Sequence, residues 1–138
     1  MLFLASSEIL RIAERVVPGA TVRDAGLIEA AAARPQAMLE GRYAYPDVVH
    51  MAAALTASLV CNHALIDGNK RLGLACLIVF LRMNGFRLDM NNDEAYELIY
   101  GIASGTCRSV PEIATILAAK TGPYRVSDSS SSSASSPS

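Results

Sequence analysis

The 138-residue sequence has no tryptophan, three phenylalanines and three cysteines, and only 18% of its residues are charged. The cysteines, Cys61, Cys76 and Cys107, are odd in number and lack the close spacing of metal-binding pairs. This pattern argues against a disulfide scaffold and against a zinc site. We expect all three cysteines to fill the core of a protein that works in a reducing cytoplasm.

Neither sign of charge dominates, since Lys and Arg total 12 and Asp and Glu total 13, for a net charge of -1. Without a global basic field, we expect no direct binding to nucleic acid or to an anionic membrane surface. The most apolar segment, residues 72–81, is shorter than the roughly 20 residues that a membrane span needs. Residues 1–5 are apolar but lack the cationic start of a secretory signal, so we expect a soluble, intracellular protein.

Apolar residues, in contrast, are abundant, at 51% of the chain, and they recur at helical spacing nearly everywhere. The length suits one well-filled core. The pattern predicts an all-α bundle of about six helices, which begin near residues 7, 24, 46, 68, 92 and 109. We expect a loop over residues 36–45 and a short extended link over residues 86–88.

Several residues are suited to helix ends. Asp24, Asn92 and Ser109 suit N-caps, Pro46 suits a first turn, and Asn84-Gly85 suits a left-handed C-cap. The helix that begins near residue 68 is apolar around most of its circumference. We therefore expect it to be the central and nearly enclosed helix of the bundle.

The end of the chain differs in composition from the rest. Residues 127–138 are serine-rich and of low complexity, and they cannot bury enough apolar area to offset the entropy lost on ordering. We expect residues 127–138 to be a disordered tail and residues 1–126 to form the single domain.

In the fifth helix, Tyr96 and Tyr100 are at helical spacing, which predicts that both belong to the core.

Chemically useful side chains gather in one stretch of ten residues directly before the fourth helix, Asn62-His63-Ala64-Leu65-Ile66-Asp67-Gly68-Asn69-Lys70-Arg71. The first backbone amides of a helix have no partner within it and attract anions. Gly68 would permit the backbone angles of such a nest and let a phosphate approach where no Cβ stands. Asn69 would add an amide donor, and Lys70 and Arg71 two cations for phosphate oxygens.

Two residues of this stretch predict more than phosphate binding. A carboxylate at Asp67, beside an anion site, is best explained by a bridging divalent cation, and Mg²⁺ suits one carboxylate plus phosphates and waters. His63 carries the side chain best suited to accepting a proton near neutral pH. The combination predicts transfer of a phosphorus group from a nucleotide to a hydroxyl.

Simpler interpretations of these residues stay open at this point. His63 could cap a helix end, and Asp67 could be the N-cap of the fourth helix. Lys70 and Arg71 could be a solvated first turn, although cations there oppose the helix dipole. We interpret His50 as a helix-face residue and three further charged residues as structural, namely Arg23, Asp24 and Arg34.

Residues 63–71 resemble the signature of the Fic/Doc superfamily, H-x-F-x-[D/E]-[G/A]-N-[G/K]-R. Lys70, where most Fic proteins have glycine, points to the Doc (death-on-curing) branch. Residues 22–29, 33–36 and 80–85 also resemble Doc-type toxins, so the likeness covers about residues 3–120. Leu65 stands where the family has an aromatic residue, and Leu72-Gly73 where Doc-type sequences commonly have Thr-Ala. A glycine at this position inside a helix suggests close packing against a neighbour.

The resemblance implies a Fic/Doc-type helical fold and the toxin of a toxin–antitoxin pair. Doc toxins are ATP-dependent kinases that phosphorylate a threonine of a translation elongation factor and arrest translation. The roles carried over by the resemblance are the general base for His63, the Mg²⁺ ligand for Asp67, the anion nest for Gly68 and Asn69, and phosphate-binding cations for Lys70 and Arg71.

Two alternatives to the kinase are an AMP transferase of the same fold and a catalytically silent module that only binds its antitoxin. Many Fic proteins carry an inhibitory helix with the pattern [S/T]-x-x-x-E-[G/N], and no glutamate of this chain has serine or threonine four residues before it. We therefore expect inhibition in trans, by an antitoxin that folds onto this protein.

Overall fold

The computed structural model describes residues 1–107 and 109–124. These residues form six α-helices, which confirms the predicted all-α fold: α1 (Ser6–Val16), α2 (Ala25–Ala33), α3 (Val48–Cys61), α4 (Asn69–Met83), α5 (Asn92–Ser104) and α6 (Val110–Ala119). A short 3-10 helix, η1 (Arg34–Gln36), follows α2. The predicted serine-rich tail, residues 127–138, and the predicted domain end at residue 126 lie outside the described residues.

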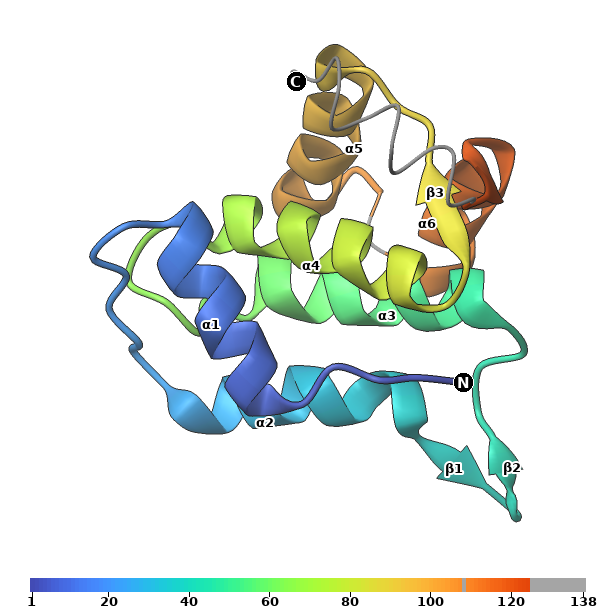
Figure 1. Ribbon diagram of the computed structural model, residues 1–138, viewed down its shortest axis with the longest axis horizontal. Helices are drawn as coiled ribbons and strands as arrows, with labels where there is room; N and C mark the ends of the chain where they lie inside the picture. Colours follow the sequence, from blue (N-terminus) through green and yellow to red (C-terminus); the bar gives the residue numbers. More distant parts are fainter. Residues whose placement is uncertain (108, 125–138) are drawn as a thin grey trace.

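Helices α3 and α4 run antiparallel through the middle of the molecule, with α1 and α2 on one side and α5 and α6 on the other (Figure 1). The prediction that α4 is the enclosed helix was wrong. Residues 51–60 of α3 are all buried, whereas α4 leaves Ile78 and Val79 more than a third exposed. The reason is that α3 contacts α2, η1, α4, α5 and α6, so neighbours cover every side of it. The apolar residues around α4 suggested that it was enclosed, but the sequence of a helix does not show on how many sides other helices cover it.

The two central helices approach each other closely at one glycine. A Cβ added to Gly73 of α4 would lie 2.5 Å from Cγ2 of Val60 on α3, which is closer than two carbon atoms can pack. The close packing expected from a glycine at this helical position is confirmed. Since Val60 lies in the last turn of α3, this contact sits directly behind the loop that joins the two helices.

Three of the predicted helix ends are confirmed. The side chain of Asp24 accepts a hydrogen bond from the amide of Gly26 and caps α2, and Ser109 caps α6 by accepting from the amide of Glu112. After Asn84, the C-cap of α4, Gly85 has a φ of +90°. Side-chain capping and a left-handed residue after the helix thus define these ends locally, as the residue types suggested.

Two helix starts differ from the prediction by one or two residues. Asp47, and not Pro46, starts α3, because its carboxylate accepts from the amide of His50 at 2.9 Å. The same carboxylate contacts the His50 ring at 2.8 Å, so this histidine serves a helix end. Asn91, and not Asn92, caps α5. For α5 the adjacent asparagine supplies the cap, and for α3 the residue after the proline does, because proline has no side-chain acceptor.

Two small antiparallel strand pairs complete the fold. Strands β1 (Met38–Leu39) and β2 (Arg42–Tyr43) form a hairpin that projects from the helices (Figure 1), in the segment predicted as a loop. Its turn residues, Glu40 and Gly41, both have positive φ. The predicted extended link is strand β3 (Phe86–Leu88), which pairs with β4 (Thr121–Pro123) at the end of the described chain.

The remaining structural assignments concern cysteines and Arg34. All three cysteines are free, but only Cys76 is buried, whereas Cys61 and Cys107 are half-buried at the edge of the core. Burial raises the pKa of the Cys76 thiol to about 12. The guanidinium of Arg34 donates to the hydroxyls of Tyr45 and Ser58, at 3.1 and 3.0 Å, and so joins η1 to α3. Within the described residues, no helix is both long and apolar enough to cross a bilayer.

Candidate active site

The loop between α3 and α4, residues 62–68, carries the predicted functional residues. His63 follows Asn62, the C-cap of α3, and its backbone has a φ of +54°. This left-handed conformation costs roughly 1–2 kcal/mol for a residue with a Cβ. The side chain of His63 is exposed, so the surroundings must hold its backbone and not its ring.

Arg23, from the segment before α2, makes contact with this backbone. Its Nε donates to the carbonyl of His63 at 2.7 Å, and its Nη2 donates to the carbonyl of Asn62 at 3.2 Å. The backbone amide of Arg23 also donates to the carbonyl of Ala64 at 2.7 Å. Arg23 therefore has the structural role expected from the sequence, and the hydrogen bonds show that its partners are backbone carbonyls.

Asn69, the first residue of α4, holds the centre of the loop. Its side chain is buried, accepts from the amide of Leu65 at 3.0 Å and donates to the carbonyl of Leu65 at 2.9 Å. Leu65 thus takes up the side-chain oxygen and one of the two N–H donors of Asn69. These bonds give the side chain a structural role, and donation to a phosphate by Asn69 stays a prediction. Leu65 itself is 1% exposed, so it anchors the loop despite being smaller than the family's aromatic residue.

Gly68 is the N-cap of α4 and has a φ of +91°, as the nest required. A Cβ at this position would lie 2.6 Å from the methyl carbons of Val17. The expectation that the missing Cβ makes room for a phosphate was wrong, since that space belongs to the end of α1. Glycine is needed here for both the backbone angle and the packing of α1 against α4.

The start of α4 presents unpaired backbone amides. The first bond of the helix runs from the amide of Leu72 to the carbonyl of Gly68, at 2.9 Å. Among the described residues, the amides of Asn69, Lys70 and Arg71 have no acceptor, and no side chain caps this end. Asp67 is thus not an N-cap, and the positive end of the helix dipole is open to an anion.

These groups line one pocket of about 420 Å³. In the part of the chain that the structure describes, no hydrogen bond or ion pair engages the side chains of His63, Asp67 or Lys70, and all three are exposed. Arg71 donates to the carbonyl of Val16 at 3.1 Å, so one end of its guanidinium is held by α1. All six site residues predicted from the sequence line this pocket, and Val60, Ile66 and Ala103 complete its lining: the six are His63, Asp67, Gly68, Asn69, Lys70 and Arg71.

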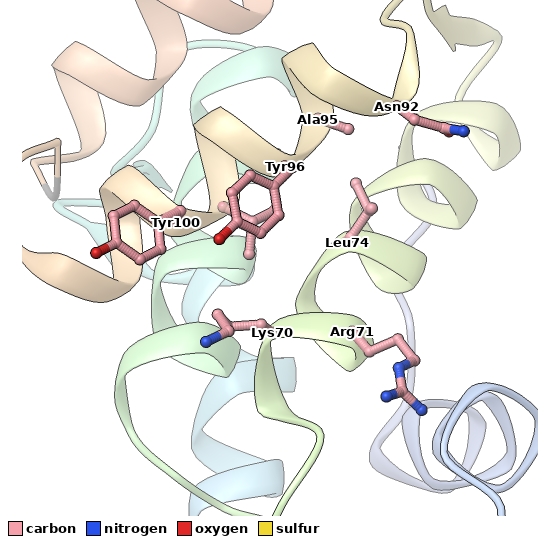
Figure 2. Close-up of a pocket in the computed structure, with 8 residues that line it drawn as sticks. Lys70, Arg71, Leu74, Asn92, Ala95, Tyr96 and Tyr100 are labelled. Atoms are coloured by element: carbon pink, nitrogen blue, oxygen red, sulfur yellow. The ribbon is translucent and has the colours of Figure 1, made fainter.

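A second pocket, of about 200 Å³, lies between α4 and α5 and shares Lys70 and Arg71 with the first (Figure 2). Tyr96 and Tyr100 form one wall, with stacked rings whose centroids are 5.8 Å apart and whose planes differ by 15°. They are 63% and 53% exposed, so the prediction that both belong to the core was wrong.

The second pocket was missed because helical spacing shows which residues share a face but not what that face meets. Leu98, Ile99 and Ile102 fill the core from α5, and the two tyrosines lie on the adjacent side. Two tyrosines spaced four residues apart were the available signal, and only the position of α4 shows that they line a cavity.

Comparison with known proteins gives the site its context. A model of the Fic/DOC family matches residues 3–81, more than half of the chain and all of the loop described above. The chain belongs to the Fic/DOC family. It is also 49% identical over 88 residues to "Toxin Doc" of Mycolicibacterium smegmatis (strain ATCC 700084 / mc(2)155), an alignment that covers 62% of this chain and 68% of that protein.

Asp67 is the residue of this Fic/DOC protein that could hold a magnesium ion, provided that phosphates and waters supply the other ligands. Among the described residues, no group of three His, Cys, Asp or Glu side chains could hold a metal by itself. Mg²⁺, however, is usually bound by one or two carboxylates together with phosphates and waters. The unpaired carboxylate of Asp67, next to open helix amides, fits an ion that arrives with a nucleotide.

Proposed function

We propose that this Fic/DOC protein is the toxin of a toxin–antitoxin pair and that it phosphorylates a protein hydroxyl at the expense of ATP. The observation that carries the proposal is the pocket in which the exposed imidazole of His63 and the carboxylate of Asp67 lie beside the unpaired amides of α4. A proton acceptor next to an anion site is what phosphoryl transfer requires of a protein.

In the proposed step, His63 accepts the proton of the target hydroxyl. The hydroxyl oxygen then forms a bond to the γ-phosphorus of ATP, the bond from that phosphorus to the bridging oxygen breaks, and ADP leaves with the electron pair. The helix amides and Lys70 stabilise the charge on the transferred group. Mg²⁺ held by Asp67 would neutralise phosphate oxygens.

In this proposal the nucleobase occupies the second pocket. Lys70 lies between the two pockets, so a nucleotide whose phosphates meet the start of α4 can extend toward the tyrosines (Figure 2). The pocket is lined by the apolar side chains of Leu74 and Ile99 beside the stacked rings, which suits a flat aromatic base.

Family membership supports a proposal for the target and for the inhibitor. We propose a threonine of a translation elongation factor as the acceptor, in the cytoplasm, and an antitoxin in trans as the inhibitor. The name of the mycobacterial relative, "Toxin Doc", and Lys70 in the Doc-type position support this assignment.

The decisive experiment incubates the purified protein with a bacterial extract and ATP labelled at either the γ- or the α-phosphate. Mass spectrometry then identifies the modified protein and the group added to it. Addition of one phosphate, from γ-labelled ATP alone, supports the kinase. Addition of AMP, from α-labelled ATP, would replace the kinase by an AMP transferase.

A parallel growth assay separates catalysis from binding. Expression of His63→Ala should not inhibit growth if catalysis causes the toxicity. Growth inhibition equal to that of the wild type, together with an unlabelled extract, would indicate a protein that acts only by binding. Co-expression of the product of the neighbouring gene should restore growth if that product is the antitoxin.

A further inference from the structure

We infer that Arg23 is a positioning residue for His63, because its guanidinium fixes the backbone that carries the imidazole. The inference rests on the proposed function in that it takes His63 as the proton acceptor. Arg23 lines neither pocket, so it acts through His63 and does not touch the nucleotide.

The geometry is specific to this histidine. The carbonyl of Asn62 belongs to the peptide plane before the Cα of His63, and the carbonyl of His63 belongs to the plane after it. One guanidinium donates to both, at 3.2 and 2.7 Å. Since a guanidinium is planar and rigid, holding both planes sets the angle between them, which is the backbone conformation of His63.

This hold is needed because the conformation is otherwise unfavourable. His63 has a φ of +54°, in the left-handed region, and lies just beyond the C-terminal end of α3. The last carbonyls of a helix lack partners within it, and a cation is the preferred group at that end. Arg23 therefore satisfies two exposed acceptors and opposes relaxation of the backbone at the same time.

Before His63, the amide of Asn62 donates to the carbonyl of Ser58 at 3.0 Å, and further contacts hold the loop after His63. The carbonyl of Ala64 accepts from the amides of Arg23 and Asp24, and Asn69 holds Leu65. In the described part of the chain, no hydrogen bond orients the imidazole itself. The direction in which the Cα–Cβ bond of His63 leaves the loop thus depends on the two carbonyl contacts of Arg23.

Nuclear magnetic resonance tests this without nucleotide or target. The chain has two histidines, so the ring Cε1–H signals of His50 and His63 are resolved easily, and His50, bonded to Asp47, is an internal control. In Arg23→Ala, the His63 signal should shift or broaden while the His50 signal stays in place. In Arg11→Ala, which removes an exposed arginine of α1, both signals should stay. A His63 signal unchanged in Arg23→Ala would overturn the inference.

Kinetics supply the second readout. Arg23→Ala should lower kcat about 100-fold, the size of a misplaced catalytic group, and leave KM for ATP unchanged. Added methylguanidine should restore part of kcat in Arg23→Ala and none in His63→Ala. Arg23→Lys should stay impaired, because an ammonium cannot bridge the two carbonyls in a fixed plane.

The two proposals fail in different ways. Wild-type kcat in Arg23→Ala, with His63→Ala inactive, would overturn the role of Arg23 and leave the proposed function intact. A wild-type protein that labels no target would overturn the proposed function, and the His63 signal in Arg23→Ala would still decide whether Arg23 sets its conformation.

Discussion

Lys70 and Arg71 separate two pockets that the chain builds in different ways. The first pocket, at the start of α4, is called the polar pocket below. It comes almost entirely from one continuous stretch, residues 63–71, and its functional groups are exposed side chains and helix amides. The second pocket, called the apolar pocket below, is assembled from α4 and α5. Helix α5 begins more than twenty residues after the start of α4. A local motif thus determines the first pocket, and helix packing determines the second.

The difference suggests a division of labour. Under the proposed function, the polar pocket carries the chemistry and the apolar pocket carries nucleotide affinity. Substitutions in the first should therefore lower kcat, and substitutions in the second should raise KM for ATP. Of the following four predictions, the first two test this division and the last two test what stabilises each pocket's surroundings, from the largest expected effect to the smallest.

His63→Ala should lower the rate of transfer by about 10²- to 10⁴-fold, the usual contribution of a general base. The melting temperature should not change, because the His63 side chain is exposed and without a partner in the described part of the chain. Labelling of a target in extract measures the rate. His50→Ala removes the chain's other histidine and should keep the activity; equal labelling by both variants would exclude His63 as the base.

The double variant Tyr96→Ala, Tyr100→Ala should weaken ATP binding by about 1–3 kcal/mol, the range for loss of base–aromatic stacking. Titration calorimetry with ATP and with inorganic tripolyphosphate separates the two pockets, since only ATP should lose affinity. Tyr43→Ala is the matched control, because Tyr43 is 47% exposed on the hairpin at the opposite end of the molecule (Figure 1). Equal losses for both ligands would show that the tyrosines do not hold the base.

These two pockets also show how far the sequence predicts the molecule. The identity of His63, Asp67 and Lys70 as exposed pocket residues followed from a motif, because their neighbours in sequence are their neighbours in space. The exposure of Tyr96 could not be predicted, since spacing along a helix does not reveal which neighbour covers it. The same holds for α3, whose burial depends on contacts with five other elements. Pairing of β3 with β4 joins segments more than thirty residues apart, which local patterns do not encode.

Asn69→Ala should destabilise the fold by about 1–3 kcal/mol, because it leaves the amide and carbonyl of buried Leu65 without partners. Denaturant unfolding measures the change. Asn62→Ala removes an exposed asparagine of the same loop and should stay within about 0.5 kcal/mol of the wild type. If the two variants were equally stable, the side chain of Asn69 would not be what holds the polar pocket together.

The smallest effect concerns the helix that carries the tyrosines. The hydrogen bond from Lys120 and the amide of Asn91 lower the pKa of the Glu94 carboxyl. A lowered carboxyl pKa contributes stability that is present above the ordinary value, about 4.3, and is lost as the pH falls through the lowered value.

Glu94→Gln should therefore flatten the acid side of a plot of melting temperature against pH. It should leave transfer at neutral pH unchanged, because Glu94 lines neither of the two pockets. If the melting temperature of the variant fell with acid as steeply as that of the wild type, other carboxylates would cause the acid sensitivity. One candidate is the capping Asp47: partial burial raises its carboxyl pKa, but hydrogen bonds from His50 outweigh this and lower it.

The glycine contact between the central helices has a genetic consequence. Val60, against which Gly73 packs, also lines the polar pocket, so any side chain added at position 73 pushes on a pocket wall from behind. Under the proposed function, a selection for cells that survive overexpression should recover missense alleles at Gly73 alongside those at His63. Those Gly73 alleles that still yield folded protein able to engage the antitoxin would distinguish a disabled catalyst from a protein that is merely degraded.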